Sequence, residues 1–230
     1  MQEKEWKIYC EKSDALLIEG LEKGLISLYD DKLIEKLRNI YYGGVPASII
    51  LLSDAMTNGY CYDRAFLLAR AFLDTDDDIN LIYATVDSLR LNPEYICDVP
   101  LYADHCIVSR TTKDGRCLIY DTSTGFVYDK EMYWLIENPK IRKIDNKESI
   151  RKFLLEEEKI NPNCTKSDKY VAEIILPMLE VKALQEDEMY SAKGIGLLQR
   201  EIEHYKQETG YTTKNKLLIK IDKNKDYLKK

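Results

Sequence analysis

Three residues in the chain have the types and positions that nucleophilic thiol chemistry requires. Cys61 follows Asn58-Gly59-Tyr60 and opens a predicted helix over residues 61–73. Free backbone amides and the helix dipole stabilise a negatively charged sulfur at a helix N-terminus. Cys61 is therefore a candidate nucleophile, although a free cysteine is by default a small buried residue. A catalytic cysteine also needs a base close to its sulfur.

The base can come from only two positions, because the chain has 2 histidines. His204 lies in a strongly charged helical stretch, and we interpret it as a solvated surface residue. His105 follows Cys61 by 44 residues, on a predicted strand, and is the better candidate. Asp121 follows by another 16 residues, on the next predicted strand. Together they match the nucleophile, base and orienting acid of a catalytic triad, although Asp121 could also serve only at a strand end.

Whether His105 and Asp121 can meet depends on the loop between their strands. A two-residue loop, Asp114-Gly115, would place Val108 opposite Asp121 and send His105 and Asp121 to different faces. A three-residue loop starting at Lys113 would place Ile107 opposite Asp121, so that His105 and Asp121 share a face as diagonal neighbours. Gly115 would then take the left-handed position that such loops favour. The sequence permits both loops.

The hydrophobic periodicity predicts an α+β fold. We expect a small antiparallel sheet packed on the helix that carries Cys61, with further helices on both sides in the sequence. Residues 1–146 form the expected core with its N-terminal helices, and residues 147–230 a helical appendage packed on that core. Helices are predicted at 5–40, 47–55, 61–73, 148–159, 167–190 and 195–208, and strands at 79–86, 104–110 and 116–122, with further short elements at 126–128 and 132–136.

Composition and charge exclude several classes of function. The chain has 34 Lys and Arg against 40 Asp and Glu, a net charge of −6, which argues against a nucleic-acid partner. Its apolar runs are far shorter than the roughly 20 residues that span a bilayer, so no membrane partner is expected. The charged N-terminus lacks the apolar core of a signal peptide, which predicts a cytoplasmic protein, with export by an uncleaved signal left open. The oligomeric state is not predicted.

No cofactor or metal ion is expected. The six cysteines contain no Cys-x-x-Cys pair, so a structural zinc site is not indicated, and free thiols are expected. The acidic run Asp76-Asp77-Asp78 lacks the spaced ligands of a calcium loop and is interpreted as a solvated loop.

The segments around the three residues resemble the motifs of the transglutaminase-like superfamily. Residues 58–65 are similar to its cysteine motif, in which Gly-x-Cys opens a helix with an alanine four residues after the cysteine. Residues 104–108 look like its histidine strand and residues 118–122 like its aspartate strand. The resemblance covers about residues 55–130 and extends to the wider papain-like group. Ile107 departs from the pattern, which commonly has an aromatic residue there.

The resemblance implies a cysteine-dependent acyl-transfer enzyme acting on an amide bond of a protein or peptide substrate. Cys61 would attack the carbonyl, His105 would move the proton and Asp121 would hold the imidazole. Water as acceptor would make it a protease or amidase, and an amine would make it a transglutaminase. A non-catalytic protein-binding module of the same fold is the alternative, and a redox sensor using Cys61 alone is a weaker one. The candidate oxyanion donors are the Cys61 amide and side chains of Tyr41, Tyr42 or Asn58, and Tyr60 and Tyr62 are candidates for lining a substrate groove.

Overall fold

The computed structural model describes residues 15–42, 45–52, 61–87, 102–160 and 192–210. The contacts divide the chain into two compact units. Unit 1 consists of Met1–Leu33 and Asn58–Glu156, and unit 2 of Ile34–Thr57 and Glu157–Lys230. This division differs from the expected one at residue 146, because the segment before Cys61 groups with the C-terminal residues. The helix expected at 167–190 lies outside the described residues.

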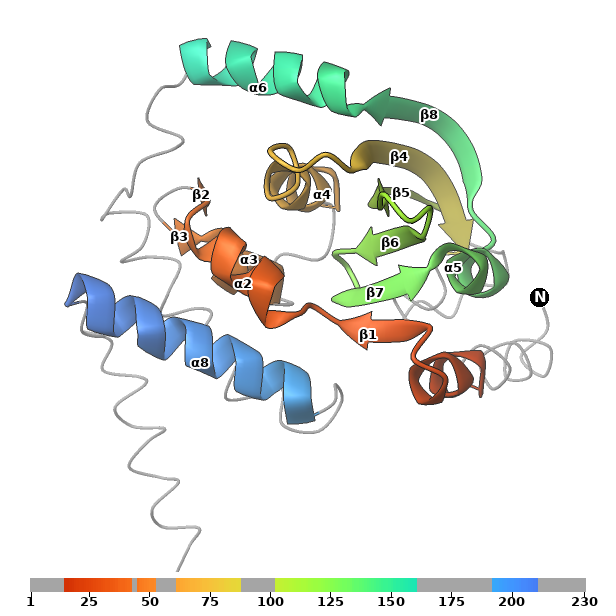
Figure 1. Ribbon diagram of the computed structural model, residues 1–230, viewed down its shortest axis with the longest axis horizontal. Coiled ribbons are helices and arrows are strands. Elements are labelled where there is room, and N and C mark those ends of the chain that lie inside the picture. Colours follow the sequence, from red (N-terminus) through yellow and green to blue (C-terminus); the bar gives the residue numbers. More distant parts are fainter. Residues whose placement is uncertain (1–14, 43–44, 53–60, 88–101, 161–191, 211–230) are drawn as a thin grey trace, which may run out of the picture. The chain divides into compact units, whose positions relative to one another are not determined.

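Unit 1 is built on a six-stranded sheet with the strand order β1-β7-β6-β5-β4-β8 (Figure 1). Every neighbouring pair of strands runs antiparallel. The α+β prediction with an antiparallel sheet is therefore confirmed. The strands are β1 (Ile26–Leu28), β4 (Asp78–Asp87), β5 (Tyr102–Thr111), β6 (Cys117–Asp121), β7 (Phe126–Asp129) and β8 (Lys140–Asn146).

Two helices cover opposite faces of this sheet. The register of β5 and β6 places Val108 and Tyr120 opposite each other on one face. Helix α4 (Cys61–Arg70) belongs to that face, since the ring of Phe72, just after it, lies 5.0 Å from the ring of Tyr120. Helix α5 (Lys130–Glu137) covers the other face. Side chains that alternate along β5 therefore point toward α4 or toward α5 in turn.

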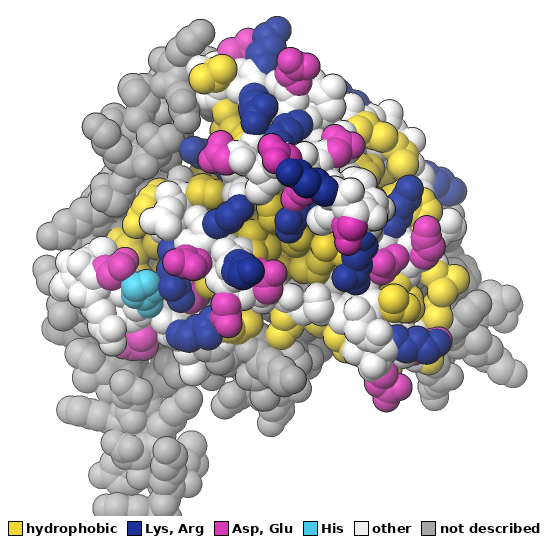
Figure 2. Space-filling view, viewed as in Figure 1, with side chains coloured by type: hydrophobic (Ala, Val, Ile, Leu, Met, Phe, Trp, Pro, Cys, Tyr) yellow, Lys and Arg dark blue, Asp and Glu magenta, His cyan; other side chains and the backbone are white. Residues whose placement is uncertain are grey.

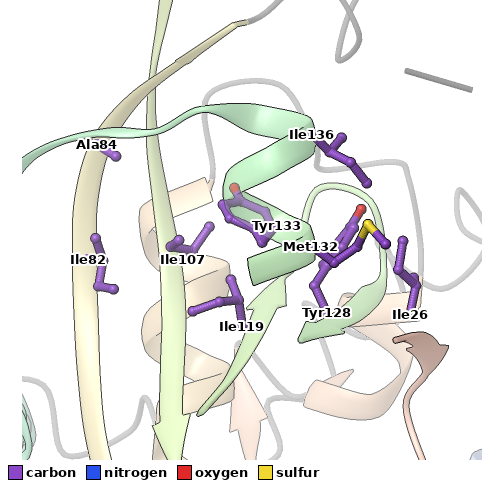
Figure 3. Close-up of a cluster of buried hydrophobic side chains, with 9 residues drawn as sticks. All are labelled: Ile26, Ile82, Ala84, Ile107, Ile119, Tyr128, Met132, Tyr133 and Ile136. Atoms are coloured by element: carbon purple, nitrogen blue, oxygen red, sulfur yellow. The ribbon is translucent and has the colours of Figure 1, made fainter. Parts of the chain in front are cut away.

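The apolar core between the sheet and α5 fixes the position of that helix. Tyr133 of α5 is directed toward the strand residue Ile107, and Met132 lies beside Ile26 and Tyr128 (Figure 3). Tyr133 and Ile119 have no exposed surface. A fully buried aliphatic or aromatic side chain contributes roughly 1.5–3 kcal/mol. The packing thus holds the Tyr133 hydroxyl at a defined place above β5 and β6.

The N-terminal region differs from its prediction. Residues 5–40 were expected to be helical, with a middle weakened by Gly20 and Gly24, but residues 15–22 form one helix and α2 (Asp31–Arg38) another, with β1 between them. Gly24 has a φ of +67°, a left-handed conformation that ends the first helix. Ile26 then pairs with Tyr128 of β7. The three- and four-residue spacing of the leucines continued across this break and so concealed it. Residues 5–14 lie outside the described part of the chain.

The strand β8 was not predicted, and its sequence explains why. Nearly all of its side chains are exposed, so the alternation that marks a half-buried strand is missing. Helix α6 (Lys147–Ile160) follows at once, close to its predicted bounds. The Nζ of Lys147 donates to the carbonyl oxygens of Thr75 and Asp77. These hydrogen bonds hold the first turn of α6 against the loop that precedes β4.

The described residues of unit 2 form the end of α2, a small hairpin and two further helices. The hairpin pairs β2 (Tyr41–Tyr42) with β3 (Val45–Pro46), and α3 (Ala47–Leu52) follows directly. Helix α8 (Ala192–Thr209) contacts α3. A bidentate ion pair joins Arg38 to the buried Glu201, with both N–O distances at 2.7 Å.

Charged side chains of both signs are interspersed over the described part of the face drawn in Figure 2. The described helices include none with the length and apolar character needed to cross a bilayer.

Candidate active site

The loop between β5 and β6 decides whether His105 and Asp121 can meet. Val108 pairs with Tyr120 and Thr111 with Cys117. The same register places Thr112 opposite Arg116. The Thr112 amide donates to the Arg116 carbonyl at 2.9 Å, and Gly115 has a φ of +85°. The loop therefore has three residues, with glycine in the left-handed position. Of the two registers that the sequence permitted, the one that brings His105 and Asp121 together is formed.

His105 and Asp121 form a direct hydrogen bond in the interior. The His105 Nε2 lies 3.0 Å from the Asp121 Oδ2, and the two side chains are 3% and 1% exposed. An ionised carboxylate can only accept hydrogen bonds, so Nε2 carries the proton and donates it. The other ring nitrogen, Nδ1, is then the one left to face Cys61.

Two more donors fix the Asp121 carboxylate. The Tyr133 hydroxyl of α5 donates to Oδ2 at 3.1 Å, and the Ser123 amide donates to Oδ1 at 2.9 Å. Both oxygens of a fully buried carboxylate are thus satisfied, which buried charge requires. Burial raises the pKa of Asp121, but His105 and these hydrogen bonds outweigh it and hold that pKa below its usual value. Asp121 is therefore ionised at neutral pH.

Cys61 is the first residue of α4 and is partly buried. Its Sγ lies 3.9 Å from the carbonyl oxygen of Asp104, the residue before His105. Burial raises the pKa of the Cys61 thiol. The hydrogen bond and charge of His105 lower this pKa, as do the backbone amides of Cys106 and Tyr62, and together they outweigh burial. The net result is a thiol pKa below the ordinary value. The sulfur thus sits among groups that favour the thiolate.

The pKa of His105 moves in the opposite direction. Burial lowers it, but the charge and hydrogen bond of Asp121, together with Cys61, raise it to about 10. A lowered thiol pKa beside a raised imidazole pKa favours a thiolate–imidazolium pair over a neutral thiol and imidazole. This is the reactive state of a cysteine nucleophile.

The end of the β5–β6 ladder explains how groups on two faces of the sheet converge. Strand β5 pairs with β4 along its whole length, but its pairing with β6 stops at Val108 and Tyr120. His105 lies beyond that last pair, where β5 has no described partner on the β6 side. Its ring can therefore reach Cys61 from the α4 side while it bonds Asp121 beside α5. A continuous ladder would separate these groups.

Among the predicted oxyanion donors, the structure describes one in the unit that carries the site. The Cys61 amide is at the first position of α4, where amides have no acceptor within the helix. Tyr41 and Tyr42 belong to unit 2. Asn58 and Tyr60, the latter predicted to line a groove, lie outside the described residues. Tyr62 stacks on Phe66 and on Tyr83, with ring centroids 6.1 and 5.5 Å apart.

The remaining candidate residues have local partners. Asp76 pairs with Lys113 and Asp77 with Arg110, both at 2.6 Å, so the hairpin provides a cation for two of the three carboxylates of the acidic run. Within the described residues, no cluster of three metal-ligating side chains occurs. His204 lies on α8, 33% exposed and 3.6 Å from Glu208. Its predicted place on a helix is confirmed, and its side chain is partly exposed.

Tyr133 and Arg64 are site residues that the sequence reasoning missed. Residues 132–136 were expected to form a short element of no stated type, and they lie on α5. Apolar residues at Met132, Tyr133 and Ile136 have the spacing of a helix face, which was a usable signal for its inward side. Arg64 is 2% exposed, and its Nη2 donates to the Thr122 carbonyl at 2.7 Å. No sequence signal marks it, because a buried arginine is rare.

Comparisons of the chain with protein-family models, curated proteins and solved structures found no match.

Proposed function

We propose that the chain is a cysteine-dependent acyl-transfer enzyme that acts on amide bonds of a protein or peptide substrate. The observation that carries this proposal is the 3.0 Å hydrogen bond between the buried His105 and Asp121, with the Cys61 thiol coupled to the same imidazole. A histidine that only fills space in the core could be neutral and would need no charged partner. An ionised carboxylate behind it, and a thiol of lowered pKa in front of it, are the requirements of nucleophilic catalysis.

The proposed reaction has two steps, each balanced within the site. The Cys61 thiolate forms a bond to the carbonyl carbon, and the His105 imidazolium gives its Nδ1 proton to the departing amine. Water, or a second amine, then attacks the thioester while His105 takes its proton, and the thiolate leaves. Asp121 stays ionised and keeps the imidazole oriented in both steps. The first residues of α4 offer amides to the developing oxyanion.

The proposal includes a transglutaminase-like or papain-like arrangement for unit 1. The order of Cys61, His105 and Asp121 and the helix-on-sheet packing support it. Hydrolysis is the favoured outcome, because an acyl-enzyme open to solvent meets water at far higher concentration than any amine.

Thiol labelling tests the proposal without a known substrate. Full-length protein is treated with iodoacetamide at pH 6, and alkylation of each cysteine is followed by mass spectrometry. We expect Cys61 to react at least about a hundredfold faster than Cys117, since an ordinary thiol of pKa about 8.5 is less than about 1% ionised at that pH. Cys117 is also partly buried and so is a matched control.

Substrate assays then separate the possible acceptors. Release of peptides from denatured proteins is compared with incorporation of an alkylamine, for the wild type, Cys61→Ala and the control Cys117→Ser. We expect turnover to be lost in Cys61→Ala and kept in Cys117→Ser. Labelling of Cys61 no faster than Cys117 would contradict the proposal and favour a non-catalytic binding module. Reversible oxidation of Cys61 that persists without His105 would favour a redox sensor.

A further inference from the structure

The sulfur of Cys61 lies against the edge of strand β5 that faces away from β4. The pairing of β5 with β6 stops short of Asp104 and Cys106. The Thr112 amide donates toward β6, at Arg116, and every second residue along β5 from there turns its amide and carbonyl the same way. Sγ lies 3.9 Å from the Asp104 carbonyl oxygen and accepts a hydrogen bond from the Cys106 amide. The sulfur therefore occupies the place at which a strand partner of Cys106 would lie.

The thiol of Cys106 lies under the first turn of α4. Cys106 is two residues from Val108 and so points to the α4 face of the sheet. Its direct partner on β4 is Tyr83, whose ring lies 5.5 Å from the ring of Tyr62, the residue after Cys61. Cys106 is 2% exposed, and both cysteines are free thiols. Two thiols therefore lie at one junction of helix and sheet, the first partly exposed and the second buried.

We propose that Cys61 and Cys106 form a disulfide bond when Cys61 is oxidised, which protects the nucleophile reversibly. Disulfides join residues whose Cα atoms lie about 4.4–6.8 Å apart. An amide nitrogen is only about 1.5 Å from its own Cα, so the contact between the Cys106 amide and the Cys61 sulfur brings the two residues close to that range. The inference rests on the proposed function in one respect, because a bridged Cys61 cannot attack a substrate and acyl transfer would stop.

The oxidant is a hydroperoxide, and each step is balanced. The Cys61 thiolate attacks one peroxide oxygen, so that an S–O bond forms and the O–O bond breaks, and the His105 imidazolium gives its proton to the departing oxygen. The Cys106 sulfur then attacks the sulfur of the sulfenic acid. The S–S bond forms as the S–O bond breaks, and the departing hydroxide takes the Cys106 proton and leaves as water. The net change is the two-electron oxidation of two thiols to a disulfide.

The two thiols differ in reactivity in the way that this order of steps requires. The pKa of Cys61 is lowered, which favours the thiolate that reacts with peroxide. Burial is the largest effect on Cys106, and together with the negative charges of Cys61, Asp145 and Asp121 it raises the pKa of that thiol. Cys106 therefore stays protonated while Cys61 is a thiolate. Oxidation of Cys61 to a neutral sulfenic acid removes one of those charges and leaves Cys106 beside the electrophilic sulfur.

Mapping of disulfides after mild oxidation tests this inference. Reduced full-length protein is treated with a small excess of hydrogen peroxide, remaining thiols are alkylated, and disulfides are identified by non-reducing proteolysis and mass spectrometry. We expect Cys61 joined to Cys106, and we expect dithiothreitol to restore iodoacetamide labelling of Cys61. In Cys106→Ala, Cys61 should proceed to sulfinic acid, which dithiothreitol does not reduce, so the restored labelling should fall at least about fivefold. Cys117→Ala removes a free thiol of β6 as the matched control and should behave as the wild type.

The results separate this inference from the proposed function. Cys61 joined to a different cysteine, or oxidised irreversibly in the wild type, would overturn the inference, as would full restoration of labelling in Cys106→Ala. If that variant does not fold, Cys106→Val replaces it, and the disulfide map of the wild type decides by itself. Fast labelling of Cys61 before oxidation, with no bond to Cys106 afterwards, would overturn the inference and leave the proposed function standing. Slow labelling before oxidation would instead contradict the proposed function.

Discussion

Each of the two histidines in this chain pairs with a carboxylate, but the surroundings of the two pairs differ sharply. His105 and Asp121 lie 3.0 Å apart on neighbouring strands, with side chains 3% and 1% exposed. His204 and Glu208 lie 3.6 Å apart on one turn of α8, with side chains 33% and 60% exposed. The same two chemical groups therefore meet once in the interior and once at the surface.

This difference determines what each pair can do. Water screens the surface pair and replaces either partner at little cost, so such pairs contribute roughly 0–1 kcal/mol. In the interior, Asp121 is shielded from solvent, and its charge and hydrogen bond raise the pKa of the His105 imidazole. The buried pair therefore lowers the pKa of its neighbour Cys61 and favours its thiolate, whereas a surface pair adds only slightly to helix stability.

The largest expected difference between the two pairs is in thiol reactivity. In His105→Ala, Cys61 loses the group that most strongly lowers its pKa, and alkylation at pH 6 should fall about a hundredfold. The control His204→Ala should leave the rate unchanged. Rates come from mass spectrometry after timed treatment with iodoacetamide. Equal rates in both variants would mean that His105 does not act on Cys61.

The next largest difference is in how much Asp121 and Glu208 contribute to the free energy of unfolding. Asp121→Asn breaks a buried pair and should lower the free energy of unfolding by about 3 kcal/mol in urea denaturation. Glu208→Gln should change it by less than about 0.5 kcal/mol.

The stability difference at Asp121 should also depend on pH. The pKa of Asp121 is held below its usual value, so its ionised form contributes stability that is fully present above about pH 3.9. That contribution is lost as pH falls through the folded-state pKa. The gap between wild type and Asp121→Asn should therefore close under acid conditions. A gap that is constant from pH 6 to pH 3 would contradict an ionised Asp121.

The smallest effect concerns the extra donor that only the buried pair has. Tyr133→Phe removes the hydroxyl that donates to Asp121 Oδ2 and leaves the ring packing in place. We expect a loss of about 1–2 kcal/mol in unfolding free energy. Cys61 alkylation should fall only severalfold, because His105 and Ser123 still bond the carboxylate. Tyr128→Phe is the matched control, since its hydroxyl donates to Thr124 instead. An equal effect in both variants would argue against a special role for Tyr133.

The sequence predicted well those elements whose own apolar residues mark them as a helix or a strand. Strands β4, β5 and β6 are runs of mostly buried aliphatic and aromatic residues bounded by polar turns, and α4, α6 and α8 have apolar faces at helical spacing. The helix expected over 5–40 failed at Gly24, where leucine spacing on both sides of the break mimicked one helix. Strand β8 could not be predicted, because its membership of the sheet depends on pairing with β4 and not on its own exposed side chains.

The sequence alone determined the three candidates for the nucleophile, the base and the orienting acid. With 2 histidines, and with Cys61 at a predicted helix start, it limited the candidates to Cys61, His105 and Asp121. It left open whether His105 and Asp121 share a face, since a one-residue change in loop length moves every side chain to the other face. The tertiary structure decided that choice through Gly115 and the Thr112–Arg116 hydrogen bond. It also brought in Tyr133 and Arg64, because partners from distant segments meet only when the chain packs.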